Sequence, residues 1–551
     1  MEIERGSVVS LAAASEPARR ATWLVALAFG LACLAWLDAT STYHGDERFY
    51  FDAALRMWSG ESWWAPEYAD GSARVNKPLL SYWIAAGSME VLGPHVLAGR
   101  LPFVIAAVAL LLATGRLARA LLPGEHAAAA LVPAMLAATS TIVTLATRCT
   151  PDILLVLGVT CTWIGLAELL VAGRSPASCA RWIWGGCALA AAAKGSLALV
   201  TALFALASIW QLRRETFGVV ARSPAVLLGG SLALAAIAPV ALRSAAAPGR
   251  SFLEDQVTAK IASSPLDWLA TALGYASTLV RHLLPWSAAA IIVALLARPR
   301  FTREFAARRR SAVLALAFAS LLLVVFSFSS TQRGRYLAPA YPALLALFAP
   351  VAMAYDQWRH SRRTSAVLLA LLSVVSIVGA LALARIDLRA GATCAALGCA
   401  LALLAWKMPL RSPTIAGALG VALVQLVGAP AIRHAFRSTH VELAAASPQV
   451  HAVWELDPPT TSSLLRFESG RRHAPEEWNA EPSEAQLAAV AAVLAGESGA
   501  EALRARGWSV VPCGFMAIRP SFSQALKILA APDSHAAFER LCLPAFLATR
   551  P

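Results

Sequence analysis

The stretch LAGRLPFVIAAVALLLATGRLA, residues 97–118, decides the fold of this chain. Its charges are Arg100 near one end and Arg116 near the other, and the run between them is uncharged. A helix needs roughly 20 apolar residues to cross the hydrocarbon core of a bilayer, which is about 30 Å thick. The stretch therefore predicts a transmembrane helix with an arginine toward each membrane surface.

Apolar runs of the same kind recur on both sides of this stretch. Over the 551 residues the mean hydropathy is +0.60, with 58% hydrophobic and 15% charged residues, whereas an ordinary soluble domain is roughly 25% charged. The sequence excludes a soluble enzyme and predicts an α-helical polytopic membrane protein with thirteen transmembrane helices. The predicted spans are 21–38, 97–118, 127–147, 153–172, 181–193, 195–211, 224–243, 281–298, 312–329, 337–355, 365–384, 390–406 and 412–431.

The net charge of +14 follows these spans and sets an orientation. With a cytoplasmic N-terminus, every loop assigned to the cytoplasm is basic, as in Arg213-Arg214 and Arg308-Arg309-Arg310. Cytoplasmic loops of membrane proteins carry this excess of Lys and Arg, so the basic balance needs no nucleic-acid partner. We expect a multi-pass protein of the bacterial inner membrane, whose first span is an uncleaved signal anchor.

The last part of the chain differs in kind from the membrane domain predicted for residues 1–435. Residues 436–551 carry many acidic side chains and no apolar run of span length, which indicates a small soluble α/β domain on the periplasmic face. We expect a strand at His451–Leu456, a helix at Glu484–Arg504, two short strands within Trp508–Arg519 and a loop at Pro475–Pro482. Whether Cys513 and Cys542 pair stays open.

Two long loops are predicted on the outer face, at about residues 39–96 and 244–280. The first is rich in Trp and Tyr, which favour the membrane interface, and it predicts helices lying in that interface. One of them covers Asp46–Trp58, because Phe49, Ala53 and Met57 recur there at a spacing of four and share one helix face.

Ionisable side chains at the membrane boundary are costly, so each outer one is a candidate for function. Asp46 and Glu47 are adjacent carboxylates that indicate a base or a cation site, or else an acidic helix N-terminus. Lys77 precedes Pro78 at a predicted helix start. Its ammonium either binds a phosphate at headgroup depth or extends to the lipid headgroups.

Three further outer segments carry charge. Asp152 follows a short turn and either caps the next helix or presents its carboxylate at the surface. Lys194 lies between two apolar runs, as a headgroup anchor or as part of a site. Arg333 and Arg335, beside Tyr336, break the positive-inside pattern, which favours binding of a phosphate.

Together these residues predict phosphoryl-linked chemistry at the outer membrane surface, where a base activates an acceptor and cations stabilise a phosphate leaving group. The sequence holds no P-loop and no Gly-rich dinucleotide fingerprint, so we expect the activated donor to be carried by a lipid. Two alternatives stay open. One is a transporter or flippase of lipid-linked sugars, which would show ionisable residues at mid-depth, and the other is a non-catalytic membrane scaffold.

At these residues the chain resembles the membrane glycosyltransferases of the GT-C class. The likeness is to the bacterial aminoarabinose transferase and protein O-mannosyltransferase-like group, and it covers roughly residues 38–342. Asp152, Lys194-Gly195 and Arg335-Tyr336-Leu337-Ala338-Pro339 match in order. The earlier matching pieces are Asp46-Glu47, Ser59-Gly60-Glu61-Ser62-Trp63, Lys77-Pro78-Leu79-Leu80 with Tyr82-Trp83, and Arg100-Leu101-Pro102.

The resemblance implies a GT-C fold with an outer α/β domain and a polyprenyl-phosphate sugar as donor. It implies an inverting transfer to lipid A, another glycolipid, a cell-surface polymer or a protein. Asp46 matches the catalytic base, Lys77 the lysine on the lipid-linked phosphate, and Tyr50 and Tyr336 aromatic residues of the donor site. We expect Arg335 and Lys194 to help bind the phosphate, and Glu47 and Asp152 to orient the acceptor or a cation.

The chain also departs from the family pattern. Asn76 stands where the family often has an acid before Lys-Pro, and Leu79 replaces a second proline. A divalent metal cation therefore stays open as a cofactor, with Asp46, Glu47 and Asp152 as its candidate ligands. The sugar and the acceptor also stay open.

Overall fold

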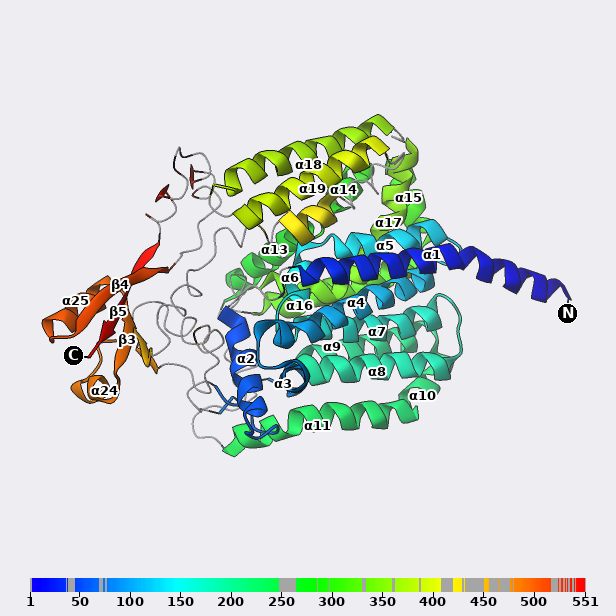
Figure 1. Ribbon diagram of the computed structural model, residues 1–551. Coiled ribbons are helices and arrows are strands. Elements are labelled where there is room, and N and C mark those ends of the chain that lie inside the picture. The colour runs from blue at the N-terminus through cyan, green and yellow to red at the C-terminus, as the bar shows by residue number, and fades with distance from the viewer. Residues whose placement is uncertain are drawn as a thin grey trace.

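The computed structural model is a helical bundle with a small sheet at one end (Figure 1). It describes residues 2–35, 37, 45–68, 73–74, 77–246, 264–284, 286–296, 298–329, 333–358, 362–385, 388–407, 420–428, 431, 450–454, 465, 476–478, 480–516 and 542–550, and isolated residues between 524 and 540. The N-terminus and the sheet lie at opposite ends of the bundle (Figure 1).

The helices of the bundle correspond closely to the predicted spans. The longer ones run side by side across the molecule (Figure 1). They are α1 Glu2–Leu34, α4 Val96–Leu121, α5 His126–Ala137, α6 Ser140–Ala146, α7 Asp152–Leu170, α8 Pro176–Lys194, α9 Ser196–Leu212, α10 Arg214–Ala221, α11 Pro224–Ala246, α13 Pro265–His282, α14 Trp286–Leu296, α15 Arg298–Ala307, α16 Arg309–Ser327, α17 Tyr341–Trp358, α18 Arg362–Leu383 and α19 Leu388–Lys407.

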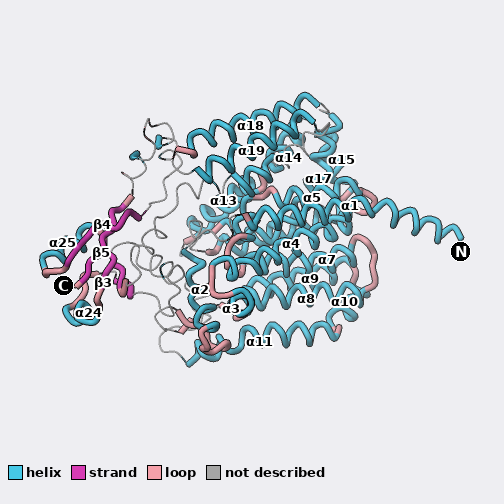
Figure 2. The backbone as a smooth tube through the Cα atoms, in the orientation of Figure 1, coloured by secondary structure: helices cyan, strands magenta, loops and turns pink. Residues whose placement is uncertain are grey.

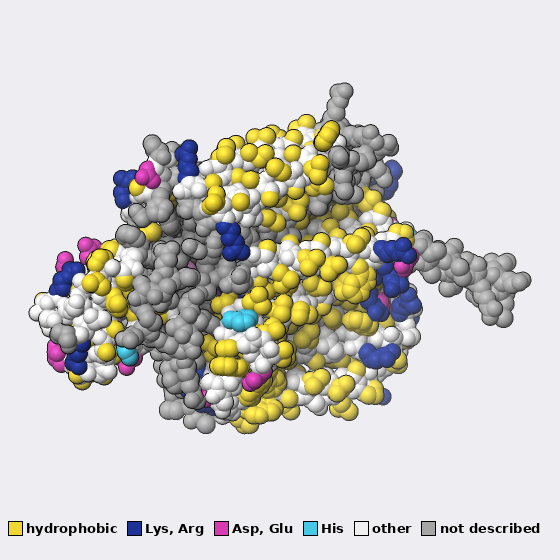
Figure 3. Space-filling view, in the orientation of Figure 1, with side chains coloured by type: hydrophobic (Ala, Val, Ile, Leu, Met, Phe, Trp, Pro, Cys, Tyr) yellow, Lys and Arg dark blue, Asp and Glu magenta, His cyan; other side chains and the backbone are white. Residues whose placement is uncertain are grey.

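Six helices of the described chain are long and apolar enough to cross a membrane, or seven if α5 and α6 form one bent span. The α-helical, polytopic fold class is thus confirmed, while the number thirteen stays a prediction. Of the predicted span 412–431, only residues 420–428 and 431 are described, with a π-helix at Val424–Gly428. Apolar side chains cover the flank of the bundle, and Lys and Arg gather at the end from which α1 emerges (Figure 3).

Glycines let α7 and α8 pack at backbone contact. A Cβ at Gly158 would lie 2.6 Å from the Ala190 nitrogen, and a Cβ at Gly186 would lie 2.4 Å from the Thr162 nitrogen. Small residues at such crossings are the common basis of helix association in lipid. Because the two helices are antiparallel neighbours, the first residue of α7, Asp152, meets the last residue of α8, Lys194.

The predicted span 127–147 is broken in the structure. The helices α5 and α6 meet at an angle of 63° around Thr139, whose backbone is extended. The Thr139 hydroxyl donates to the Met135 carbonyl at 3.1 Å, and Ser and Thr compete in this way with helical bonding. Irregular backbone at membrane depth is tolerated where it lines a cavity, and α6 forms one wall of the pocket described below.

The first outer loop folds into two helices, as expected, α2 Gly45–Trp58 and α3 Leu80–Leu92. Helix α3 begins at Leu80 instead of at Pro78, and the Leu79 N–H donates to the Ala236 carbonyl of α11 at 2.9 Å. Between the helices, the buried guanidinium of Arg74 lies 5.0 Å from the ring centres of both Tyr50 and Tyr68. This aromatic cluster fixes α2 against α3.

The C-terminal sheet confirms an α/β unit but corrects its elements (Figure 2). The expected strand exists as β1 Ala452–Trp454. The predicted helix at Glu484–Arg504 is α24 Glu484–Ala489, strand β3 Ala492–Ala495 and α25 Glu497–Ala505. The predicted pair of strands is one bulged strand, β4 Ser509–Met516, and the predicted loop at Pro475–Pro482 contains β2 Glu476–Trp478. The strand order is β2-β1-β3-β5-β4, with β5 at Leu543–Thr549.

Strand β3 forms where a helix was predicted because the sheet supplies a partner on each side. It pairs in parallel with β1 and in antiparallel with β5, and all four of its residues are buried. Tertiary pairing here overrides the helical preference of an Ala-rich run. Among the residues that the structure describes, Cys513 and Cys542 are thiols, and the Cys513 Sγ donates to the Ala545 carbonyl.

A buried ion pair joins the first outer helix to the bundle. Arg100 donates through Nε and Nη2 to the two carboxylate oxygens of Glu47, each at 3.0 Å, and neither side chain has any exposed surface. Arg100 also donates to the Leu37 carbonyl, and Glu47 accepts from the Cys149 N–H at 2.8 Å. The pair therefore ties together the segment after α1, helix α2, helix α4 and the turn before α7.

We predict that Arg100→Met destabilises the protein strongly, by about 3–5 kcal/mol, because it leaves the buried carboxylate of Glu47 without its counter-ion. The measurement is chemical unfolding in detergent micelles. The matched control is Arg116→Met, which breaks a bidentate pair with Glu168 at 2.8 and 3.1 Å. Because the Arg116 side chain is 41% exposed, its loss should be clearly smaller, and equal losses would contradict the assignment.

Candidate active site

The centre of the candidate site is Asp46, in the first turn of α2. Its Oδ2 accepts from Nη2 of Arg335 at 2.7 Å and from Nη1 of Arg333 at 3.2 Å. Both arginines come from the segment that enters the 3-10 helix η3 Gly334–Ala340. Two residues nearly three hundred positions away in the sequence thus hold the predicted base at the end of the bundle that faces the sheet (Figure 1).

A second carboxylate extends this network into the bundle. Arg335 Nε lies 3.6 Å from Oδ2 of Asp152, whose other oxygen is bonded to the Lys194 ammonium. The Asp152 side chain is only 5% exposed, so its charge depends on these cations. Asp152 makes no side-chain cap to α7, whose preceding residue is Pro151. Of its two predicted roles, the structure favours the carboxylate in a site over the helix cap.

Lys194 also contacts the aromatic residue next to Arg335. Its ammonium lies 4.4 Å from the centre of the Tyr336 ring, which packs against Phe326 at 5.2 Å. A cation over an aromatic face is held by the ring quadrupole. The structure thus brings together four predicted site residues, Asp152, Lys194, Arg335 and Tyr336, around Asp46.

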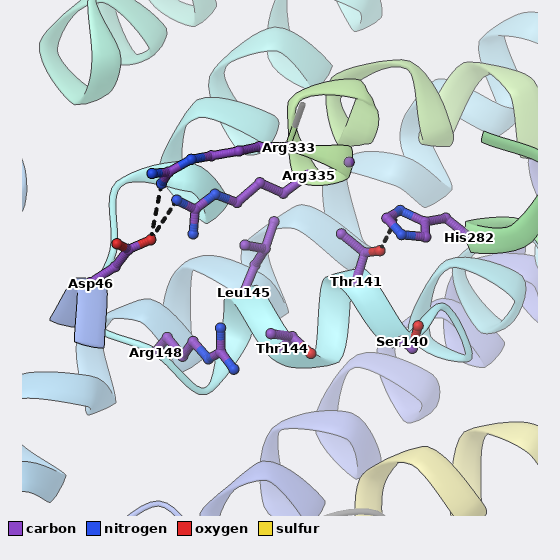
Figure 4. Close-up of a pocket in the computed structure, with 10 residues that line it drawn as sticks. Asp46, Ser140, Thr141, Thr144, Leu145, Arg148, His282, Arg333 and Arg335 are labelled. Atoms are coloured by element: carbon purple, nitrogen blue, oxygen red, sulfur yellow. Dashed lines mark hydrogen bonds and ion pairs between the residues drawn. The ribbon is translucent and has the colours of Figure 1, made fainter. Parts of the chain in front are cut away.

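A pocket of about 540 Å³ opens beside Asp46 (Figure 4). Arg333 and Arg335 reach Asp46 from one side, and Arg148 lies on the opposite wall with its guanidinium toward the cavity (Figure 4). The remaining lining is mostly small and polar, consisting of Ser140, Thr141, Thr144, Leu145, His282 and Gly334. The pocket therefore combines a carboxylate, three guanidinium groups and several hydroxyls in one space.

Lys77 and Tyr50 lie near this network but do not line the pocket. Lys77 is close enough to Asp152 to act on its carboxylate electrostatically. Tyr50 is buried, with its ring stacked on Tyr82 at 5.3 Å and beside Arg74. Burial raises the pKa of the Tyr50 phenol well above its usual value, so the group stays neutral.

Glu47 points away from the pocket, into its buried pair with Arg100. The structure thus separates the two adjacent carboxylates, because successive helix residues are rotated by about 100° around the helix axis. Asp46 faces the cavity and Glu47 faces the core. The role expected for Glu47, to orient an acceptor or a cation, stays a prediction. Its contacts with Arg100 indicate that it stabilises the fold.

The three candidate metal ligands do not converge. Asp46 is paired with Arg333 and Arg335, Asp152 with Lys194 and Arg335, and Glu47 with Arg100. In the described part of the chain no group of three His, Cys, Asp or Glu side chains is placed to hold a metal ion. Neighbouring cations already pair with these carboxylates, and a divalent metal cation as cofactor stays a prediction.

Sequence reasoning missed part of the pocket. It did not single out Arg148, His282, Ser140, Thr141 or Thr144. These residues come from α13 and from the broken helix, and small hydroxyl side chains in an apolar run give no signal of their own. The available signal was the polar cluster Thr139-Ser140-Thr141 inside a predicted span.

The comparisons with known proteins match part of this chain to a family model and most of it to a known fold. A family model described as dolichyl-phosphate-mannose-protein mannosyltransferase matches residues 76–242. No curated protein sequence matches the chain closely enough to count as a relative.

The solved structures identify the particular fold. The structure is similar to ArnT from Cupriavidus metallidurans in the apo state, at 18% identity and a TM-score of 0.63, covering 93% of this chain and 97% of that chain. It is equally similar to the same protein bound to undecaprenyl phosphate, at 18% identity and a TM-score of 0.62, covering 95% and 97%. The resemblance to the GT-C class is confirmed for the fold, because the chain has the ArnT-like GT-C fold.

We predict that Asp152 and Lys194 are energetically coupled. Asp152→Asn and Lys194→Met each remove one side of the same ion pair, so their effects on the free energy of unfolding should be non-additive by about 1 kcal/mol or more. Unfolding of the two single variants and the double variant in detergent micelles measures this. The control cycle combines Asp152→Asn with Arg116→Met. Arg116 pairs with Glu168 and not with Asp152, so the two effects on the free energy of unfolding should be additive.

Proposed function

We propose that this protein is an inner-membrane glycosyltransferase that moves a sugar from a polyprenyl-phosphate carrier to an acceptor on the periplasmic face. The observation that carries the proposal is the 2.7 Å contact between Asp46 and Arg335, which unites a base with a phosphate-binding cation. The ArnT-like fold supports it. The undecaprenyl phosphate bound by the solved ArnT supports a polyprenyl-phosphate donor.

In the proposed reaction, Asp46 accepts the proton of an acceptor O–H or N–H group. The acceptor atom forms a bond to the anomeric carbon, and the bond from that carbon to the phosphate oxygen breaks. Polyprenyl phosphate leaves with the electron pair of that bond. Attack opposite to the leaving group inverts the configuration at the anomeric carbon.

Arg335 has two roles in this scheme, as the counter-ion of two carboxylates and as a ligand of the donor phosphate. Before a donor binds, it neutralises Asp46 and Asp152. The phosphodiester of the donor carries one negative charge on two non-bridging oxygens, and a guanidinium can contact both at once. In this scheme Arg335 turns from Asp46 to the phosphate when the donor binds, and the Asp46 carboxylate becomes available to the acceptor. Lys194, Lys77 and Tyr336 complete the donor side.

The proposed orientation places the pocket and the sheet on the periplasmic face. The Lys and Arg side chains at the opposite end of the bundle, where α1 emerges, support it (Figure 3), since such an excess is typical of the cytoplasmic side. The termini at opposite ends of the bundle support an odd number of crossings (Figure 1).

We predict that Asp46→Asn lowers sugar transfer by about 10²–10⁴-fold, the range for loss of a general base. Purified protein is incubated with membranes of a strain that lacks it, and with undecaprenyl phosphates carrying a radiolabelled pentose or hexose. The label that has left the undecaprenyl-phosphate donor is counted after the remaining donor has been separated from the products by thin-layer chromatography. Transfer by Asp46→Asn at the wild-type rate would refute the mechanism.

The control for this experiment is Asp267→Asn. Asp267 is an exposed carboxylate in the first turn of α13, outside the pocket, so the variant should keep wild-type transfer. Movement of the undecaprenyl-phosphate-linked sugar across the bilayer, without transfer of the sugar to an acceptor, would instead support the transporter alternative.

We predict that Arg335→Met weakens binding of undecaprenyl phosphate about 10- to 100-fold, because it removes a charge-assisted contact to the phosphate. Binding is measured by the shift in thermal unfolding that the lipid produces in detergent. Arg308→Met, which breaks a pair with Glu125, is the matched control and should leave the lipid affinity unchanged. Equal affinities of Arg335→Met and the wild type would remove Arg335 from the donor site.

A further inference from the structure

His282 is a polar side chain of the pocket that the scheme above does not use. It is the last residue of α13 and lines the same cavity as Asp46. Figure 4 shows it beside Thr141 on the wall away from Asp46, with its ring toward the segment of the two arginines. The side chain is partly buried, at the boundary of an otherwise apolar bundle.

The imidazole is fixed through one of its two nitrogens. Nδ1 lies 2.9 Å from the Thr141 hydroxyl of α6 and 2.8 Å from the Tyr341 hydroxyl of α17. Which of these groups donates depends on the tautomer, but in either case Nδ1 is occupied by protein. In the part of the chain that the structure describes, Nε2 makes no hydrogen bond to protein.

The other edge of the imidazole, with Cε1 and Nε2, packs against Gly334. A Cβ at position 334 would lie 2.6 Å from Cε1 and 3.2 Å from Nε2 of His282, and 2.5 Å from Cγ2 of Thr278. Any side chain at this position would push the imidazole away. The glycine between Arg333 and Arg335 therefore seats His282 against the segment that holds Asp46.

The wall beside His282 carries the hydroxyl of Thr141, and the hydroxyls of Ser140 and Thr144 line the same cavity. Arg335 reaches this cavity at Asp46, away from His282 (Figure 4), whereas Lys194 and Tyr336, which we also assign to the donor, do not line it. A neutral imidazole nitrogen and hydroxyl groups recognise neutral hydroxyls and amides.

We propose that His282 is a specificity-determining residue whose Nε2 hydrogen-bonds a hydroxyl or amide of the acceptor, at the end of the pocket opposite Asp46. The inference rests on the proposed function and deepens it. Asp46 takes the proton of the attacking atom, while His282 holds a second polar group of the same acceptor. Two fixed points orient the acceptor toward the anomeric carbon.

The test compares His282→Phe with His282→Gln in the transfer assay. Membranes from the strain that lacks the protein are the acceptor pool, and their amount is varied at saturating donor. Phe keeps an aromatic ring but removes both nitrogens, and Gln also lacks Nδ1, so the difference between the two variants reports on Nε2. In His282→Phe the half-saturating amount of acceptor should rise about 3- to 10-fold, as expected for one neutral hydrogen bond. Gln places an amide near the position of Nε2 and should stay within about 2-fold of wild type.

The half-saturating concentration of the undecaprenyl-phosphate sugar should stay at the wild-type value in both variants. A purely structural role would instead change the donor and acceptor requirements together, and that result overturns the proposal. An unchanged acceptor requirement in His282→Phe also overturns it. Absence of transfer by the wild-type protein refutes the proposed function and, with it, this inference.

A second variant decides the matter if His282→Phe does not fold, which loss of binding to undecaprenyl phosphate would reveal. Thr141→Val keeps the imidazole and removes one of its anchors. We expect a rise of about 2-fold or more in the half-saturating amount of acceptor, with the donor requirement unchanged. An acceptor requirement equal to wild type in Thr141→Val then refutes the inference.

Discussion

The buried pair of Glu47 and Arg100 is the interaction on which the rest of the site depends. Both charges are fully buried, and either charge without its partner would strongly destabilise the fold. The pair therefore fixes the first turn of α2 against α4 and against the turn before α7. Asp46 is the neighbour of Glu47, so its direction into the pocket follows from the same constraint. The buried Glu47 carboxylate thus positions the Asp46 carboxylate.

Two departures from regular helix packing then shape the space around Asp46. The break at Thr139 turns α6 into a polar wall, where a straight span would present an apolar flank. The glycine contacts between α7 and α8 bring Asp152 to Lys194, which in turn lies under Tyr336. The break shapes the pocket directly, and the glycine contacts act through the ends of the two helices that they hold together.

The charged half of the site could be predicted from the sequence, because charged residues are rare within and beside apolar transmembrane runs. Asp46, Asp152, Lys194 and Arg335 stand out against apolar runs, and the structure brings them together. His282 and the hydroxyls of α6 did not stand out, since their partners come from distant segments and from a bend that hydropathy does not register. In the sheet, the Ala-rich run at β3 was predicted as helix, because its strand pairing is set by β1 and β5. Local preference decides such elements only where no partner competes.

The ion pairs around Asp46 join two carboxylates, Asp46 and Asp152, to three cations, Arg333, Arg335 and Lys194. The cluster thus carries a net positive charge, which an anionic group such as a phosphate would bring toward balance. If the protein acts on a polyprenyl-phosphate sugar at the membrane surface, as proposed, every anionic phospholipid nearby competes electrostatically for this cluster. Under that proposal charge alone cannot select the donor, and discrimination has to come from the shape of the carrier chain and of its sugar.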